Sequence, residues 1–347
     1  MGTLNLELSL STSWNGSRHQ RVAGIVEEHR GLGFRQLEAY CHFTPDQLEE
    51  LRREAGDREV VISSLHSPCP VAVDDSGARA RWGDWLASTV ESERVYGVDA
   101  IKRTIDFASE VGARGVVIHL GNVGIFPRQR TIVDAIAQHG RSSEEHRRLV
   151  DEAWRERESR KGPHLDAALR SIRALGEHAA GTPVRLGVEA RDGYHEIPSL
   201  DEVADVLSAC DGLPVYYWHD AGHGAKLEYA GFVEHEDYLR RYGDRMLGMH
   251  IHDTLAGRDH LAPGQGETDF AMLARYLRPE TIRTVELHSH VTPEQISHAV
   301  QLLSQLGIGS TGASPEALQI GLWDSPPADA PTPTPPPSLG EGLGWGP

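Results

Sequence analysis

Residues that can bind a metal ion or move a proton recur at the ends of short apolar segments of the chain. Each segment is rich in β-branched or aliphatic residues, and a histidine, aspartate or glutamate closes or follows it. These residues are His66, His119, Glu189, Asp220, His223, His250, His252, Asp253 and Glu286. Because imidazoles and carboxylates are common ligands of divalent metals and common proton carriers, the recurrence predicts a metal-dependent active site.

The types of ligand limit which metals fit. Oxygen donors and imidazole nitrogens suit Mn²⁺, Zn²⁺, Mg²⁺ or Fe²⁺. The cysteines Cys41, Cys69 and Cys210 are scattered, and only Cys69 stands near one of these segments, so a thiolate site is not indicated. A buried carboxylate without a partner is costly, whereas a divalent cation turns that cost into bonds. We therefore expect a divalent metal as cofactor.

The apolar segments alternate with longer stretches of helical period, which is the pattern of a parallel α/β sheet. We predict eight strands, over 4–10, 35–39, 60–65, 115–119, 184–189, 215–219, 246–251 and 281–287. Helices are predicted between them, for example over 98–112, 164–180 and 293–306. Eight such units predict a (β/α)8 TIM barrel, in which the carboxyl ends of all strands meet at one rim and would gather the residues named above.

Two segments do not fit this repeat. Residues 121–163 are too long for one loop and dense in Arg and Glu, which predicts a helical hairpin inserted after the fourth strand, over the barrel mouth. A solvated charged helix with no part in the chemistry is the favoured interpretation of its role. After Gly312 the chain is rich in Pro, Gly and Ser and poor in apolar groups, which predicts a disordered tail. The expected organisation is a catalytic barrel over 1–312 and a tail over 313–347.

Composition limits the partners of the chain. Its 347 residues carry a formal net charge of -17, so a polyanion such as nucleic acid would meet an unfavourable average field. No apolar run approaches the roughly 18 residues that span a bilayer, and no signal peptide is evident, so we expect a cytoplasmic protein without a membrane anchor. Lys102, Lys161 and Lys226 are the only lysines, and none lies in a predicted strand, which counts against Schiff-base chemistry. A small-molecule substrate is the expected partner.

Seven short motifs lie at the predicted strand ends. They are Leu65-His66-Ser67-Pro68, Ile118-His119-Leu120-Gly121, Val188-Glu189-Ala190, His219-Asp220-Ala221-Gly222-His223, Met249-His250-Ile251-His252-Asp253, His260-Leu261-Ala262-Pro263-Gly264-Gln265-Gly266 and Val285-Glu286-Leu287. The set resembles the xylose-isomerase-like barrel superfamily, which includes sugar phosphate isomerases and epimerases and the endonuclease IV type of apurinic endonuclease. The resemblance covers about residues 4–307, and its most specific part is Asp220-x-x-His223 followed by His250-x-x-Asp253.

The resemblance implies a metal site made by Glu189, Asp220, His250 and Glu286, the set shared by the isomerase and epimerase branch. In that branch Glu189 and Glu286 would also move protons at the carbon next to a carbonyl. The implied activity is metal-dependent isomerisation or epimerisation of a sugar, a sugar phosphate or a sugar-like compound. A homodimer is suggested by the resemblance alone.

The endonuclease branch leaves a second activity open, a multinuclear-metal phosphoesterase acting on abasic sites or other phosphodiesters. It would need His66 and His119 for a second metal and His223 and His260 for a third. The third set is imperfect, because Arg258 stands where that branch has an aspartate. For His223, contact with a substrate hydroxyl is an equal alternative to metal binding.

Four further positions carry weaker expectations. Glu38, His260 and Arg258 are candidates for substrate contact, with a salt bridge inside the rim as an equal alternative for Glu38. His252 is expected to be a core histidine rather than a site residue. The run over 264–266, Gly-Gln-Gly, gives a weak phosphate-binding signal, because barrels often bind phosphate through backbone N–H groups after strand seven.

Overall fold

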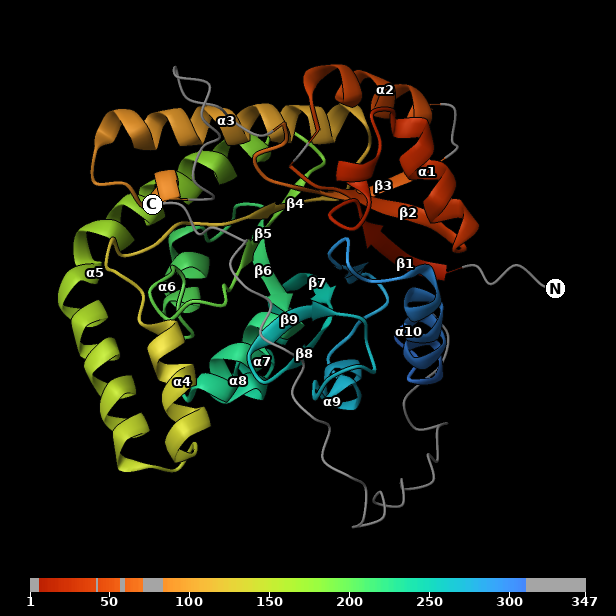
Figure 1. The fold of residues 1–347 in the computed structure, drawn as a ribbon. Coiled ribbons are helices and arrows are strands. Elements are labelled where there is room, and N and C mark those ends of the chain that lie inside the picture. The colour runs from red at the N-terminus through yellow and green to blue at the C-terminus, as the bar shows by residue number, and fades with distance from the viewer. Residues whose placement is uncertain (1–5, 42, 57–59, 71–83, 310–347) are drawn as a thin grey trace, which may run out of the picture. The chain divides into compact units, whose positions relative to one another are not determined.

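The computed structural model describes residues 6–41, 43–56, 60–70 and 84–309. Eight parallel strands close into a barrel in the order β1-β10-β7-β6-β5-β4-β3-β2 (Figure 1). They are β1 (Leu6–Ser11), β2 (Phe34–Ala39), β3 (Val61–His66), β4 (Gly115–Ile118), β5 (Arg185–Glu189), β6 (Val215–Asp220), β7 (Met246–Ile251) and β10 (Ile282–Val285). Each overlaps one of the eight predicted strands, so the predicted TIM barrel is confirmed.

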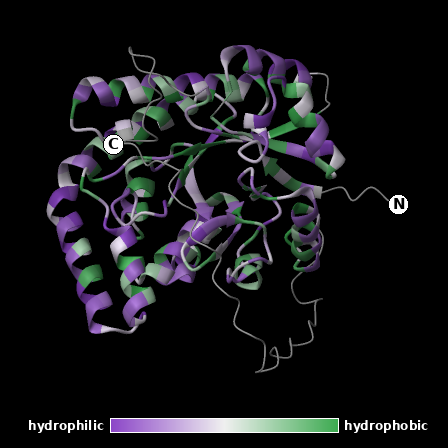
Figure 2. Ribbon diagram, viewed as in Figure 1, coloured by the Kyte–Doolittle hydropathy of each residue, from purple (hydrophilic) through white to green (hydrophobic). Residues whose placement is uncertain are grey.

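Helices surround this barrel, and Figure 2 shows hydrophobic residues along the strands and hydrophilic residues on the outer sides of the helices. The α-helices are α1 (Val22–Gly31), α2 (Pro45–Gly56), α3 (Glu91–Glu110), α4 (Gln129–His139), α5 (Glu144–Ala179), α6 (Glu202–Ala209), α7 (Ala221–Ala230), α8 (His235–Tyr242), α9 (Phe270–Ala274) and α10 (Pro293–Gln305). No helix in the described parts of the chain is both long and apolar enough to cross a membrane. The tail predicted over 313–347 lies outside the described residues.

Helices α4 and α5 form the inserted hairpin, but its end was predicted wrongly. The hairpin was expected to end at residue 163 and a separate barrel helix to begin at 164. Helix α5 instead runs without a break through Pro163 and is 36 residues long in all, so it serves as both. A proline inside a helix removes one hydrogen bond and crowds the preceding turn. Here the buried face continues on both sides of it, with Arg157 before and Ile172 after, and packing against α3 and α6 outweighs that cost. The hairpin thus lies against α6 and α7, beside the rim.

A short two-stranded sheet between β7 and α9 was not predicted. Strand β8 (Asp253–Leu255) pairs antiparallel with β9 (Arg258–Leu261). The turn between them places Ala256 and Gly257 at φ values of 50° and 79°. Strands of three and four residues carry too little period-two pattern to be recognised in a sequence, although this hairpin holds His260 at the rim.

The barrel interior below the rim is filled by one large side chain. Trp218 is fully buried, and the neighbouring strands carry glycine beside it, Gly187 on β5 and Gly248 on β7. A Cβ atom at Gly248 would lie 2.3 Å from the Trp218 ring, and one at Gly187 would lie 2.7 Å from it. Side chains two apart on a strand share a face, so this layer lies directly beneath Glu189, Asp220 and His250 and forms the floor of the site.

Candidate metal centre and active site

Four predicted ligands converge on this floor from neighbouring strands. The Nδ1 atom of His250 lies 2.6 Å from Oε1 of Glu189 and 3.1 Å from Oε2 of Glu286. The same atom lies 3.4 Å from Oδ2 of Asp220. All four side chains are buried, and one ligand atom from each lies within 4.8 Å of the others. The structure therefore brings together the four residues that the sequence singled out as metal ligands.

The chemistry of this group fits a divalent cation. An imidazole carries at most one proton on Nδ1, so His250 can donate to only one of the three carboxylates around that atom. The remaining negative charges face one another in a buried place, which is unfavourable without a compensating cation. One imidazole lone pair and three carboxylates form a donor set that Zn²⁺, Mn²⁺ or Fe²⁺ accepts.

Glu38 lies behind His250 rather than at an exposed surface of the site. Its Oε2 atom lies 3.2 Å from Nε2 of His250 and accepts a hydrogen bond of 2.8 Å from the Ser64 hydroxyl. Metal-binding histidines commonly donate their second N–H to a carboxylate, which fixes the tautomer and the ring orientation. The structure thus shows the ion pair inside the rim that was the alternative expected for Glu38.

The two carboxylates predicted to move protons differ in their surroundings. Burial alone would raise the pKa of Glu189, but His250 and His119 beside it hold that pKa well below its usual range. Burial raises the pKa of Glu286 to about 8, with help from Glu38 and Glu189 and against the opposing charge of His250. The two carboxyl groups therefore differ in their electrostatic surroundings, with Glu189 beside two imidazoles and Glu286 beside one.

A second predicted group, His66, His119 and Glu189, lies next to the first. Their ligand atoms also lie within 4.8 Å of one another, and the His66 and His119 rings meet edge to face at 4.5 Å. Nε2 of His119 lies 2.5 Å from Oε2 of Glu189. The guanidinium of Arg191 reaches the same place: its Nη1 lies 3.0 Å from Nε2 of His119 and 3.4 Å from Oε2 of Glu189. The positively charged guanidinium of Arg191 thus lies next to two of the possible ligand atoms of this group.

A third group contains His223, His252 and His260, and its composition corrects a prediction. His252 was expected in the core, but side chains two apart on a strand share a face, so it lies on the same side as His250. Its Nε2 lies 2.9 Å from Oδ1 of Asp220. Its Nδ1 accepts the backbone N–H of His260 at 2.9 Å. A neutral imidazole has one lone pair, which that N–H already uses, so in this geometry His252 orients Asp220.

The other two histidines of this group are held by neighbouring elements. The backbone N–H of His223 donates to Oδ1 of Asp220 at 2.7 Å, because Asp220 is the N-cap of α7. The His260 ring stacks between those of His252 and His288, with centroid distances of 4.2 Å and 3.9 Å. Both rings therefore lie at the rim near Asp220. Their roles as metal ligands or substrate contacts stay predictions.

Asp253 organises the loop that follows β8 and β9. Its carboxylate accepts the backbone N–H groups of Gly264 at 2.9 Å and Gly266 at 2.8 Å. It also accepts those of Thr254 and Thr268, at 2.8 Å and 3.0 Å. The weak phosphate-binding prediction for 264–266 is therefore wrong, because the N–H groups that would bind a phosphate already bind this carboxylate.

A buried lysine ties the β8–β9 hairpin to the loop after β5. Lys226 of α7 pairs with Asp192 and, at 2.7 Å, with Oδ2 of Asp259. Asp259 precedes His260, so this bridge fixes the strand that carries that ring. Arg258 lies on the same strand, and its side chain is exposed. That side chain forms no hydrogen bond or ion pair with the described residues. That position gives no support to its predicted contact with substrate.

Comparison with known proteins decides the family. A family model described as Xylose isomerase-like TIM barrel matches residues 26–306. The chain belongs to this family. Its membership confirms the resemblance inferred from the seven motifs and agrees with the closed barrel.

Individual relatives of this family are distant in sequence. The uncharacterized protein y4fM of Sinorhizobium fredii is 25% identical over 303 residues, which are 79% of this chain and 84% of that protein. The solved structure of a D-tagatose 3-epimerase-like protein has a TM-score of 0.61 and 16% identity and covers 86% of this chain and 96% of its own. A 3-keto-D-glucoside 4-epimerase from E. coli has a TM-score of 0.60 and 16% identity over 86% of this chain and 99% of its own. At these identities the structures establish the shared fold.

Several residues at the rim were missed in the sequence. Arg191 stands two positions after Glu189, and that spacing was a usable signal because such residues share a face along extended chain. Its Nε donates to Oε1 of Glu196 at 3.1 Å. Tyr40, after β2, lies with its ring 4.9 Å from that of His66. Nothing in the local pattern of Tyr40 or Lys226 indicated that they would reach the site.

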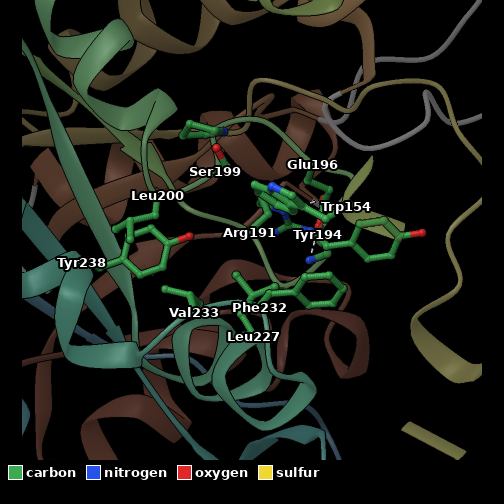
Figure 3. A pocket seen from close by; sticks show the side chains of 12 residues that line it. Trp154, Arg191, Tyr194, Glu196, Ser199, Leu200, Leu227, Phe232, Val233 and Tyr238 are labelled. Atoms are coloured by element: carbon green, nitrogen blue, oxygen red, sulfur yellow. Dashed lines mark hydrogen bonds and ion pairs between the residues drawn. The ribbon is translucent and has the colours of Figure 1, made fainter. Parts of the chain in front are cut away.

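Arg191 also lines a largely apolar pocket (Figure 3). The empty space of this pocket, including the part open to solvent, is about 330 Å³. Its lining residues are Trp154, Arg191, Gly193, Tyr194, Glu196, Pro198, Ser199, Leu200, Leu227, Phe232, Val233 and Tyr238. Trp154 comes from α5, so the inserted hairpin contributes a wall of this pocket and is more than a solvated charged helix.

Proposed function

We propose that this protein is a divalent-metal-dependent isomerase or epimerase of a sugar, a sugar phosphate or a sugar-like compound. The observation that carries the proposal is the group formed by Glu189, Asp220, His250 and Glu286, in which three carboxylates surround one imidazole nitrogen at 2.6, 3.1 and 3.4 Å. The epimerase names of the similar solved structures support the same class of reaction.

The order of the strands separates the two proton-carrying carboxylates. Glu189 ends β5 and Glu286 follows β10, with β6 and β7 between them in the barrel. A substrate lying over Asp220 and His250 would therefore have one carboxylate toward each side. Epimerisation needs a proton to leave one face of a carbon and another to arrive on the opposite face, and this arrangement supplies a group for each.

The chain's own residues divide the work in this mechanism. A divalent cation held by the four ligands would polarise the substrate carbonyl and stabilise the negative charge that develops when the neighbouring carbon loses its proton. Glu189 receives that proton in one direction, and Glu286, on the other side of Asp220 and His250, delivers a proton to the opposite face. Glu38 keeps His250 in orientation through its Nε2 atom.

The alternative activity, phosphodiester cleavage with two or three metals, receives less support. Arg191 adjoins the place of a second metal, His252 has its lone pair engaged by a backbone N–H, and Arg258 replaces the expected aspartate. The net charge of -17 is also unfavourable on average for a nucleic-acid substrate.

A substrate screen tests the proposal. The purified protein, reconstituted with Mn²⁺, is incubated with ketohexoses, their phosphates and a 3-keto-glucoside, and the products are followed by nuclear magnetic resonance. We expect interconversion of at least one epimer or isomer pair, lost on chelation and restored by Mn²⁺. Cleavage of an abasic-site duplex or of bis(4-nitrophenyl) phosphate, with no sugar interconverted, would instead establish the alternative.

A further inference from the structure

Arg191 stands where a second metal ion would have to bind. That ion would take the Nε2 lone pair of His119 and a carboxylate oxygen of Glu189, together with His66. The Nη1 atom of Arg191 lies 3.0 Å from the first of these atoms and 3.4 Å from the second. The guanidinium therefore contacts two of the three ligand atoms that the second ion would need.

Arg191 is held in this position by its other contacts. Its Nε donates to Oε1 of Glu196 at 3.1 Å, and Oε2 of Glu196 is itself fixed by the backbone N–H of Gly193 at 2.8 Å. Its side chain is only 20% exposed. Guanidinium remains protonated at any physiological pH, so this cation does not dissociate. Displacing it toward solvent would break its hydrogen bond to Glu196.

A divalent ion and this guanidinium compete for the same place. Both are cations, and Nη1 of Arg191 lies against the same two atoms, Nε2 of His119 and Oε2 of Glu189, that the ion would bind. Two positive charges at such a distance in a buried place repel each other strongly. The first group differs in this respect, because no arginine or lysine nitrogen of the described residues lies within 4.0 Å of Asp220 or Glu286.

We propose that Arg191 takes the place of a second metal ion, so that the centre holds one divalent metal per chain. This inference rests on the proposed function for the first metal and adds a role for Arg191. The arginine supplies a fixed positive charge to Glu189 and His119 without offering a position for a second metal-bound water. A centre of this kind suits proton transfer and lacks the paired ions that two-metal phosphodiester hydrolysis uses.

Metal content of arginine variants tests the inference. Wild type, Arg191→Ala, Arg191→Lys and the control Arg155→Ala, which changes an exposed arginine of α5, are reconstituted with Mn²⁺ alone and freed of excess metal. Elemental mass spectrometry gives the number of ions per chain. Electron paramagnetic resonance distinguishes isolated Mn²⁺ from a spin-coupled pair, which two ions about 3.5–4 Å apart would form.

The expected numbers are one ion per chain in wild type, Arg191→Lys and Arg155→Ala, and two, with a coupled spectrum, in Arg191→Ala. Adding His66→Ala and His119→Ala to Arg191→Ala should return the number to one. Two ions in wild type, or one in a folded Arg191→Ala, would overturn the inference. If circular dichroism shows that Arg191→Ala does not fold, His66→Ala/His119→Ala with Arg191 intact decides: unchanged metal content supports the inference, and a loss of metal overturns it.

These outcomes separate the inference from the proposed function. One ion per chain with the expected Arg191→Ala result, but no sugar interconverted by wild type, would leave the inference standing and remove the proposed function. Sugar interconversion by a wild type that holds two ions would do the reverse. A wild type that binds no Mn²⁺ would contradict both.

Discussion

Two of the buried charged places in the described part of the chain are built in opposite ways. Between α5 and α6, Arg157 donates to both carboxylate oxygens of Glu202, at 2.7 and 2.6 Å, so the charges balance. At the barrel rim, the carboxylates of Glu189, Asp220 and Glu286 converge on one nitrogen of His250. The balanced pair is complete without any ligand, whereas the rim group is not. Unbalanced buried charge is thus the feature that distinguishes a site from a structural ion pair.

The largest expected effect comes from removing either proton-carrying carboxylate at the rim. Glu189→Gln and Glu286→Gln should each lower kcat by about 10²- to 10⁴-fold, the usual contribution of a positioned acid or base. Loss of a metal ligand should lower metal content in the same variants. Steady-state kinetics and elemental mass spectrometry measure both. Glu267→Gln, at an exposed position near the rim, is the control and should change neither.

The balanced pair should respond in stability rather than in chemistry. Glu202→Gln leaves Arg157 with only Glu158 at 3.1 Å, and Arg157→Met leaves Glu202 with only Lys161 at 3.8 Å as an ion-pair partner. Breaking a buried pair typically costs about 3–5 kcal/mol in the free energy of unfolding. Urea denaturation of each variant measures that cost. Metal content should stay at the wild-type value in the folded fraction. Loss of metal without loss of stability would show that the two places are not separate in the way described.

Asp253 offers a case between these two, a charge satisfied entirely by backbone N–H groups. Asp253→Asn cannot accept from Gly264 and Gly266 through its amide nitrogen, so we expect the free energy of unfolding to fall by about 3 kcal/mol. Denaturation by urea measures the change, with Asp211→Asn on the surface as the control. An unchanged midpoint would mean that the loop does not depend on this carboxylate.

The free energy of unfolding should depend on pH through His29, a buried histidine that lies outside the metal centre. His29 lies 3.1 Å from Oδ1 of Asn15, and burial lowers the pKa of His29 to about 3. In the unfolded chain its pKa is about 6.5, so the unfolded state binds the proton first as pH falls. Stability contributed by His29 is complete above pH 6.5 and is lost toward pH 3, by about 1.4 kcal/mol per pH unit.

Replacing this histidine tests the sign of that effect. His29→Gln keeps a donor for Asn15 but cannot titrate, so its free energy of unfolding should fall less steeply between pH 6 and pH 4 than that of wild type. Urea denaturation at a series of pH values gives both slopes. Equal slopes would show that His29 is not neutral in the folded protein.

The smallest effect on metal is expected at the third group. His260→Ala should leave metal content unchanged. In this group, Nδ1 of His252 already accepts a backbone N–H, and position 258 carries an arginine instead of the aspartate that would bind a metal. A substrate contact by His260 would appear as a raised KM with little change in kcat. A fall in metal content would place a further ion in this group and weaken the contrast with the rim carboxylates.

Short-range patterns predicted the barrel and placed the candidate ligands at its rim, and the resemblance to a known family singled out four of them. Apolar runs mark the strands, and residues at strand ends must meet at one rim. The sequence could not show which atom each polar group of the site faces. Whether the His119 lone pair faces a metal or Arg191, and whether N–H groups at Gly264 face a ligand or Asp253, depends on side-chain directions that no spacing encodes. His252 was misplaced for a simpler reason, an error about which strand face it shares.

Deuterium exchange on each face of the substrate tests the central claim most directly. In D₂O, with enough Mn²⁺ to keep wild type and variants loaded with metal, wild type should introduce deuterium at the carbon next to the carbonyl of both epimers of the substrate pair. Glu189→Gln should exchange only one epimer and Glu286→Gln only the other, with neither interconverting the two, because each variant keeps a proton carrier on one face. Interconversion by wild type without any deuterium uptake, or equal exchange of both epimers by either variant, would contradict proton transfer by this pair of carboxylates.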